Sequence, residues 1–226
     1  RWSMSKCFNL IPLAAAFIAA NAFAKVETIT LEDLPVLKQE SQHSTASKRV
    51  TNFFTRAHYK LIDLNDELST KIFDRYLESL DFGKRIFLKS DIDSFEQYRF
   101  LVDNALSTGK LDFAFDIFNV SMKRRFDSYQ YSISLLDKEM KFENEDEYKF
   151  DREEAKWATT QAELDEIWRQ RVKYDALRLK MTGKEWPDIK EILTKRYSYT
   201  LKRLVQTNSE DAFQIAMNAF ARSIEA

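Results

Sequence analysis

The sequence predicts an all-α protein: an irregular multi-helix domain of about six to seven helices, preceded by a signal peptide. Turn residues are scarce, because the 226 residues include only Gly83, Gly109 and Gly183, and Pro187 is the sole proline after Pro35. A β-sandwich or a doubly wound α/β domain uses many more glycines and prolines than this. Apolar residues also recur at intervals of three and four, the period of a helix packed on one face.

Residues 1–24 have the three parts of a secretory signal peptide. Arg1 and Lys6 give a basic start, and residues 8–20 are almost wholly apolar. An Ala-Phe-Ala sequence closes the segment with the small-x-small pattern at which signal peptidase cleaves. The sequence therefore predicts an exported protein whose mature chain begins at Lys25.

An uncleaved membrane anchor is the alternative for this segment. Its apolar run of about 13 residues is shorter than the roughly 20 that a spanning helix needs, and Pro12 interrupts it. Cys7 stands before the apolar run and not after it, so the pattern is not that of a lipoprotein signal. Residues 1–3 precede Met4 and are interpreted as an upstream remnant.

Charge and cysteine content narrow the functions that the exported chain can have. Cleavage removes Arg1 and Lys6 and no acidic residue, so the formal charge changes from -1 to -3. This near balance gives no electrostatic reason to bind nucleic acid or an anionic membrane surface. The only cysteine, Cys7, leaves with the same segment, so the mature chain has no disulfide and depends on its hydrophobic core.

The mature chain is expected to begin with an extended segment, residues 25–44, followed by a helical domain over residues 45–226. Apolar stripes predict a first helix from about residue 45 to 62. They predict a second helix over residues 68–80, which Gly83 ends.

The next two helices are predicted from their ends and from one long seam. Ser90 with Asp93 resembles a capping box that opens a third helix, which stops near Gly109. A fourth helix of about 40 Å, at 1.5 Å per residue, is predicted over residues 111–136. Its apolar residues step by three and four: Leu111, Phe115, Phe118, Met122, Phe126, Tyr129, Ile133 and Leu136.

Residues 141–158 interrupt the helical pattern and are expected to form an acidic loop, with Phe150 and Trp157 as candidate anchors. Three helices are predicted beyond it. Thr160 and Glu163 form a second capping box, and Gly183 closes the helix that they open. Pro187 suits the first turn of the following helix, and the last helix is expected to begin at residue 208 or 209.

No residue is predicted to be catalytic, to bind a cofactor or to hold a metal. The mature chain has two histidines, His43 and His58, and no cysteine, so the ligand cluster of a zinc site is missing. The acidic residues at 143–147 lack the regular ligand loop and turn glycine of a calcium site, which favours a solvated loop. A glycine-rich phosphate loop and a Gly-x-Ser-x-Gly sequence are also absent. His58 beside Tyr59 is best interpreted as a buried hydrogen-bonding pair, with a pH-sensitive contact or an active-site base as alternatives.

The basic triplet Lys123-Arg124-Arg125 with Phe126, Tyr129 and Tyr131 is the one pattern that suggests nucleic-acid binding. The preferred interpretation is a local solvated face, because the aromatic residues at 126 and 129 belong to the apolar seam and the exported chain is slightly acidic.

Short segments spread over the mature chain carry a family resemblance. They are Pro35-Val36-Leu37-Lys38 with Glu40, Gln42 and His43; Thr51–Tyr59; Lys71–Leu77; Ser107–Asp112; Lys123–Phe126; Tyr129–Tyr131; Leu179–Lys184; Gln206–Asp211; and Ala219–Arg222. In this order they resemble the N-terminal helical domain of the bacterial tail-specific proteases, a family of periplasmic carboxy-terminal processing peptidases.

The resemblance implies an ATP-independent serine endopeptidase of the periplasm that cleaves exported proteins with apolar C-terminal tails. In this family a PDZ domain captures the tail, and a serine activated by a lysine of lowered pKa attacks the peptide carbonyl. The PDZ and protease regions follow the part of the family that this chain resembles, so no catalytic residue is carried over. Residues 45–226 are expected to form the non-catalytic N-terminal helical domain.

The domain's own role is expected to be architectural: it packs against the later domains, helps to enclose the substrate and offers a surface to partners such as a periplasmic adaptor protein. Candidate contact surfaces are the exposed faces around Tyr129–Tyr131 and the loop Phe142–Trp157, with core packing as the alternative for both. A stand-alone periplasmic helical adaptor or scaffold is the competing function. The apolar stripe of the last helix favours a domain of a larger protein.

Overall fold

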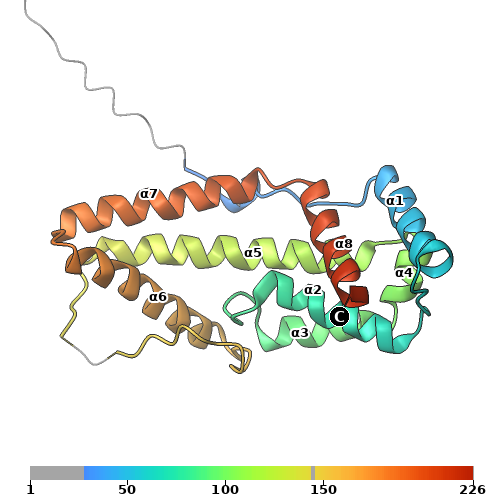
Figure 1. The fold of residues 1–226 in the computed structure, drawn as a ribbon. Coiled ribbons are helices and arrows are strands. Elements are labelled where there is room, and N and C mark those ends of the chain that lie inside the picture. The colour runs from blue at the N-terminus through green and yellow to red at the C-terminus, as the bar shows by residue number, and fades with distance from the viewer. Residues whose placement is uncertain (1–27, 144–145, 226) are drawn as a thin grey trace, which may run out of the picture.

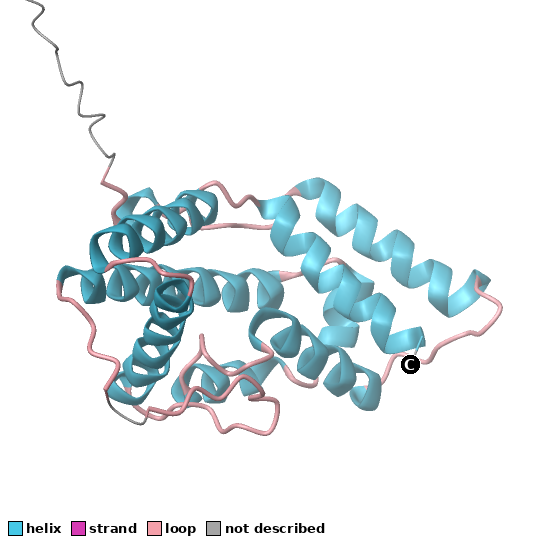
Figure 2. Cartoon of the chain, turned by 60° about the vertical axis from the view of Figure 1, so that its left-hand side comes forward, coloured by secondary structure: helices cyan, strands magenta, loops and turns pink. Residues whose placement is uncertain are grey.

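The computed structural model describes residues 28–143 and 146–225, and within these ranges the protein is all-α with eight α-helices. The described part contains no strand, and its isolated β-bridge joins Leu88 to Ala158. Figure 2 shows helices connected by loops. The predicted fold class is therefore confirmed. The predicted signal peptide, residues 1–24, lies outside the described residues.

The eight helices are numbered in chain order. They are α1 (Ser41–Asn52), α2 (Asp66–Asp81), α3 (Lys89–Phe95), α4 (Val102–Thr108), α5 (Asp112–Ser134), α6 (Gln161–Met181), α7 (Trp186–Val205) and α8 (Ser209–Glu225). Helix α5 runs along the middle of the molecule, with α7 beside it (Figure 1). Helix α6 packs against α5 and α7 at one end, whereas α1, α2, α4 and α8 gather at the other.

The predicted seam of the longest helix is confirmed, and the helix is buried on a second side as well. Phe115, Phe118 and Met122 of the seam are buried, and so are Phe113 and Ile117, which lie between them. The helix is shorter than predicted, about 35 Å for 23 residues, because its last turn narrows to a 3₁₀ helix at Leu135–Asp137.

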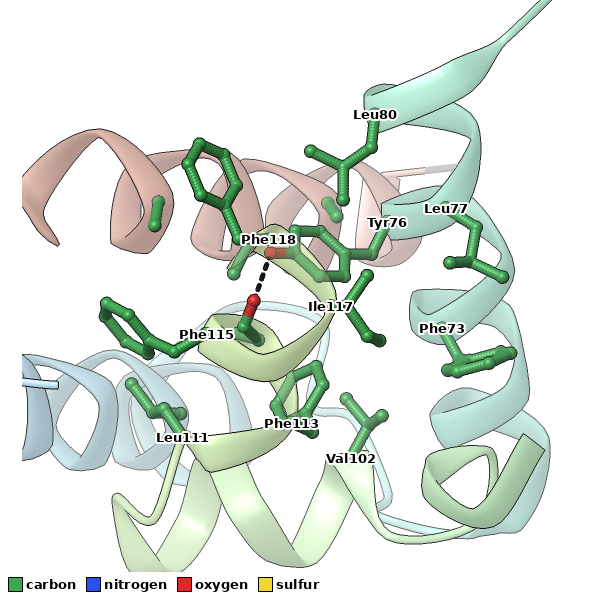
Figure 3. Close-up of a cluster of buried hydrophobic side chains, with 14 of the residues drawn as sticks. Phe73, Tyr76, Leu77, Leu80, Val102, Leu111, Phe113, Phe115, Ile117 and Phe118 are labelled. Carbon is green, nitrogen blue, oxygen red and sulfur yellow. Dashed lines mark hydrogen bonds between the residues drawn. The ribbon is translucent and has the colours of Figure 1, made fainter. Parts of the chain in front are cut away.

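The largest apolar core joins α2, α5 and α8. Figure 3 shows the side chains of α2 interleaved with those of α5. The hydroxyl of Tyr76, which is fully buried, donates a 2.6 Å hydrogen bond to the backbone oxygen of Ala114. Burial raises the pKa of this phenol well above its ordinary value. The bond satisfies the hydroxyl that Tyr76 places in this core.

Two smaller clusters continue the core toward the other end of α5. One lies between α5, α6 and α7 and contains Leu136, Val172, Ala176, Ile189, Leu193 and Tyr197. The other lies where the chain before α3 meets the start of α6 and contains Ile86, Leu88, Ala158, Leu164 and Trp168. The indole N–H of Trp168 donates to the backbone oxygen of Arg85 at 2.7 Å, which links these segments.

The first helix differs from its predicted range at both ends. It begins at Ser41 and not at 45, because the backbone N–H of Glu40 donates to His43 Nδ1 at 3.1 Å and so caps the helix earlier. It does not continue to residue 62. Beyond Asn52 it widens into a π-helix, Phe53–Ala57, which ends where the N–H of His58 donates to the oxygen of Phe53 at 2.9 Å.

The predicted third helix is divided into α3 and α4. The capping box predicted at Ser90 and Asp93 is wrong: the N-cap is Leu88, two residues earlier, and Asp91 accepts from the backbone N–H of Leu88 at 2.9 Å. The division has a cause that is distant in sequence. The hydroxyl of Ser69, on α2, accepts from the N–H of Val102 at 2.9 Å and donates to the oxygen of Arg99 at 2.7 Å. A buried side chain therefore satisfies the backbone where the helix breaks.

Local signals predicted the remaining ends correctly. Thr160 caps α6 by accepting from the N–H of Glu163 at 3.2 Å, although the Glu163 carboxylate accepts from the N–H of Thr159 instead of Thr160. Pro187 lies in the first turn of α7, and Asn208 caps α8 by accepting from the N–H of Asp211 at 3.1 Å.

We predict that Gly109→Ala destabilises the protein more than Gly183→Ala. Both glycines have left-handed backbones, with φ of 72° and 86°, which costs any other residue about 1 kcal/mol. A Cβ on Gly109 would also lie 2.8 Å from the backbone oxygen of Ser44, whereas nothing lies within 4 Å of one on Gly183. We expect Gly109→Ala to lower the free energy of unfolding by about 2 kcal/mol or more. Denaturant unfolding of both variants measures this, and equal losses would contradict it.

Candidate interaction surfaces

The described residues offer no cluster for catalysis by a metal. No group of three or more His, Cys, Asp or Glu side chains in the described ranges is arranged to hold an ion. Among the helices that the structure describes, none is long and apolar enough to cross a membrane. The candidate functional sites among the described residues are therefore surfaces and buried polar contacts.

The basic triplet is not the solvated face that the sequence suggested. Arg124 makes a bidentate ion pair with Asp91, at 2.8 and 2.9 Å, and thereby joins α5 to α3. The guanidinium of Arg125 points inward and donates through Nη2 to the backbone oxygen of Leu80. Only Lys123 of the three is exposed. The triplet is used mainly for packing inside the domain.

The face around Tyr129–Tyr131, expected to be a contact surface, is also largely used within the chain. The ring of Tyr129 lies 5.1 Å from that of Trp168 and 6.0 Å from that of Tyr197, measured between centroids. Gln130 donates to the backbone oxygen of Ile29 at 2.9 Å, which holds the N-terminal segment against α5. The core alternative therefore fits this face better.

The loop Phe142–Trp157 divides into an anchored end and an exposed end. Trp157 packs against the main core, its ring 6.2 Å from Phe87, and Lys84 lies 5.9 Å from the Trp157 ring. Phe150 is 63% exposed. Of the two anchors that the sequence suggested, Trp157 acts as one and Phe150 does not.

Phe150 belongs to an aromatic surface that we define by Tyr148, Phe150 and Tyr174. Tyr148 stacks on Tyr174 of α6 at 4.6 Å, and Phe150 contacts both rings edge-on at 4.8 and 4.7 Å. A cleft of about 260 Å³ opens beside these rings and is also lined by Phe142 and Leu177. This aromatic surface is the part of the loop that is available to a partner.

An ionic contact fixes the same loop to α6. Asp146 pairs with Lys173 and lies 3.5 Å from Arg169. The hydrogen bond from Lys173 lowers the pKa of the Asp146 carboxyl below its ordinary value. The side chains of Lys173 and Asp146 are 12% and 32% exposed, so the pair is only partly open to water and holds the loop against α6.

A buried histidine that the sequence analysis did not single out connects the two ends of the described chain. His43 is 1% exposed and stacks on Phe213 at 4.5 Å. Its Nδ1 accepts from the backbone of Glu40, so Nε2 carries the proton and donates to Glu210 at 2.9 Å. Helix α1 is thereby fixed to the start of α8. Residue spacing along the chain does not predict this contact, because its partners are 167 residues apart.

The extended segment before α1 is held by two amide side chains. Gln39 donates to the backbone oxygen of Gly109 and accepts from the N–H of Leu111, both at 2.6 Å. Asn119 of α5 bonds both the N–H and the oxygen of Leu37 at 2.9 Å. We call His43, Glu210, Gln39 and Gly109 the N-terminal clasp. It fixes the segment as one more layer on α5.

His58 and Tyr59 do not form the predicted buried pair. Tyr59 is 93% exposed, and its ring lies 4.3 Å from that of His58 without a hydrogen bond between them in the described structure. His58 Nδ1 lies 3.0 Å from the backbone oxygen of Lys60. Tyr59 is exposed, whereas the half-buried His58 lies edge-on to Phe53 and Phe54 of the π-helix at 5.5 and 5.1 Å.

Comparison with known proteins gives the family. Residues 50–226 match the family model described as the tail specific protease N-terminal domain. The chain is also 43% identical over 231 aligned residues to a tail-specific protease of Haemophilus influenzae. The chain belongs to the tail-specific protease family. That alignment covers 100% of the chain but 33% of the relative, so the chain spans about a third of the relative's length.

Three segments that carry the tail-specific protease resemblance meet at the N-terminal clasp. His43 comes from the first, Gly109 from the second and Glu210 from the third, and Gln39 lies between resembling residues of the first segment. Gly109 has a reason to be glycine there, since a Cβ would strike Ser44 of α1. The resembling residues in these segments thus hold the helices of the domain together.

We predict that Trp157→Ala destabilises the protein more than Phe150→Ala, because Trp157 belongs to the anchored end of the loop and Phe150 to the exposed end. Loss of the half-buried indole should lower the free energy of unfolding by about 2 to 3 kcal/mol. Loss of the exposed Phe150 ring should cost less than about 1 kcal/mol, because only contacts with Tyr148 and Tyr174 disappear. Thermal and urea unfolding of the two variants measure this. A larger loss for Phe150→Ala would place that ring in the core.

We further predict that the stabilising effect of Glu210 depends on pH. The hydrogen bond from His43 holds the pKa of Glu210 below its ordinary 4.5, so folding favours the ionised carboxylate. The advantage of the wild-type protein over Glu210→Gln should be present above about pH 4.5 and lost as the pH falls through the folded pKa. Urea unfolding from pH 7 to pH 3 measures it.

Glu78→Gln is the matched control for this experiment, because Glu78 is an exposed carboxylate on α2. Its difference from the wild-type protein should stay small at every pH. A difference between wild type and Glu210→Gln that does not change with pH would contradict the role assigned to the Glu210 charge.

Proposed function

We propose that the chain is the non-catalytic N-terminal helical domain of a periplasmic serine endopeptidase that processes exported proteins with apolar C-terminal tails. The observation that carries this proposal is the 43% identity to a tail-specific protease along the whole chain, together with the match to the family's N-terminal domain. The catalytic serine and lysine and the PDZ domain of the proposed peptidase would lie in the two-thirds of the relative that this chain does not span.

The role proposed for the domain itself is architectural. Its helices are fixed around α5 by apolar cores and by the N-terminal clasp, which suits a rigid wall that packs against later domains and encloses a substrate. The aromatic surface at Tyr148, Phe150 and Tyr174 supports the further proposal of contact with a partner such as a periplasmic adaptor protein.

We predict that the 226-residue chain does not cleave a denatured polypeptide ending in apolar residues, whereas a full-length protease that contains it does. The physical reason is that the serine and lysine of the proposed mechanism would lie in the part of the relative that this chain does not span. Gel analysis of the cleavage products measures this, with the same polypeptide ending in aspartates as a control substrate. Cleavage by the 226-residue chain would overturn the proposal, and inactivity of both proteins would favour the adaptor function.

A further inference from the structure

A cleft of about 580 Å³ lies where α7 ends and α8 begins, against α5 and the end of α2. Figure 1 shows α8 crossing α5 in this region. Two arginines, Arg125 of α5 and Arg203 of α7, line the cleft. Of the contacts described above, only the hydrogen bond from Arg125 to Leu80 involves either arginine.

Arg125 is a half-buried cation without an ion pair in the described structure. Its one hydrogen bond is that of Nη2 to the oxygen of Leu80, although a guanidinium has five N–H donors. Burial lowers the pKa of Arg125, and nearby Asp81 acts against this shift. Asp81 is already engaged: Oδ1 accepts from the N–H of Arg85 at 2.8 Å, and Oδ2 accepts from those of Ile86 and Phe87 at 2.8 and 3.0 Å.

Arg203 adds a second positive charge that no neighbouring carboxylate neutralises. It lies in the last turn of α7, and no side-chain hydrogen bond or ion pair of Arg203 is found in the described structure. The acidic side chain among the cleft residues is Asp211. Asp211 is occupied at the start of α8, where it accepts from the N–H of Asn208 at 2.9 Å. That hydrogen bond leaves the Asp211 charge in place, so the lining carries two positive charges and one negative charge, and the net charge of +1 favours anions.

The rest of the lining combines apolar and hydroxyl groups. Phe118 and Met122 of α5 and Ile215 of α8 give an apolar wall. Ser79 and Thr200 contribute hydroxyls at the rim. A ligand that satisfies both parts needs a negative end for the arginines and an apolar body for the wall, which is the usual composition of a small-molecule site.

We propose that this cleft binds an organic carboxylate that bears an apolar group, with the carboxylate at Arg125 and Arg203 and the apolar group against Phe118, Met122 and Ile215. Planar guanidinium groups match a carboxylate in geometry as well as in charge. Two sources share this chemistry: the last residue of a polypeptide and a free fatty acid. The site goes beyond the proposed architectural role, because it does not depend on the rest of a protease.

The proposal is tested by calorimetric titration of the 226-residue chain with N-acetyl-leucine and, separately, with octanoate. We expect saturable binding of one acid or both to a single site. Neutral analogues, N-acetyl-leucinamide and 1-octanol, should bind at least about tenfold more weakly, because a hydrogen-bonded charge is lost. Binding of N-acetyl-leucine alone supports the site with polypeptide ends as the source, and binding of octanoate alone supports it with fatty acids as the source.

Two substitutions on α7 locate the binding. Arg203→Gln should weaken the acid that binds by about tenfold. Lys202→Gln removes the same charge from the adjacent exposed residue, which does not line the cleft, and should change the affinity less than about twofold. Arg125→Lys should also weaken binding, because it keeps the charge and removes the planar fork.

The proposal is overturned by any of three results. They are no saturable binding of either acid, equal binding of a neutral analogue, and wild-type affinity in Arg203→Gln. The last of these is decisive even if Arg125→Lys fails to fold, since Arg203 is exposed and its substitution leaves the core intact.

Discussion

Burial of α5 on more than one side is the constraint on which the rest of the structure depends. A helix of 23 residues with buried Phe113 and Ile117 as well as Phe115 and Phe118 cannot be covered by a single neighbour. Helices α2 and α8 therefore cover its first half, and α6 and α7 cover its second. The cores form a series along α5, and the remaining helices take their places from the part of α5 that they cover.

The N-terminal clasp positions the segment before α1 and α1 itself by hydrogen bonds. Leu34 and Leu37 of the segment before α1 pack on the main core, and amide and imidazole groups add directed contacts, through Gln39 at Gly109 and His43 at Glu210. Hydrogen bonds specify distance and direction where apolar contacts do not. The clasp thus sets the position of α1 relative to α8, which apolar contact between these helices would leave less defined.

The sequence predicted the features of the fold that local chemistry determines. The helical class, the seam of α5, the glycine at the end of α4 and the caps of α6 and α8 all follow from residues close together in the chain. The failures share the opposite property. Ser69 divides a predicted helix, Asp91 neutralises Arg124, and Glu210 meets His43, each from a distant segment. Residue spacing along the chain carries no information about such distant partners, so the sequence did not predict these polar contacts.

In this domain the surroundings of each charged residue indicate its role better than the sequence motif that contains it. A partly buried charge adds little to the stability of a purely architectural domain. Replacing buried charged groups by apolar residues of similar size often leaves the free energy of unfolding unchanged or raises it. Arg124 is accounted for by Asp91, and Lys123 by exposure to water. Arg125 has only part of each explanation: it is half-buried, the neighbouring Asp81 accepts from three backbone N–H groups, and Arg125 lines an open cleft. The proposed carboxylate would supply a second opposite charge to Arg125, beside that of Asp81.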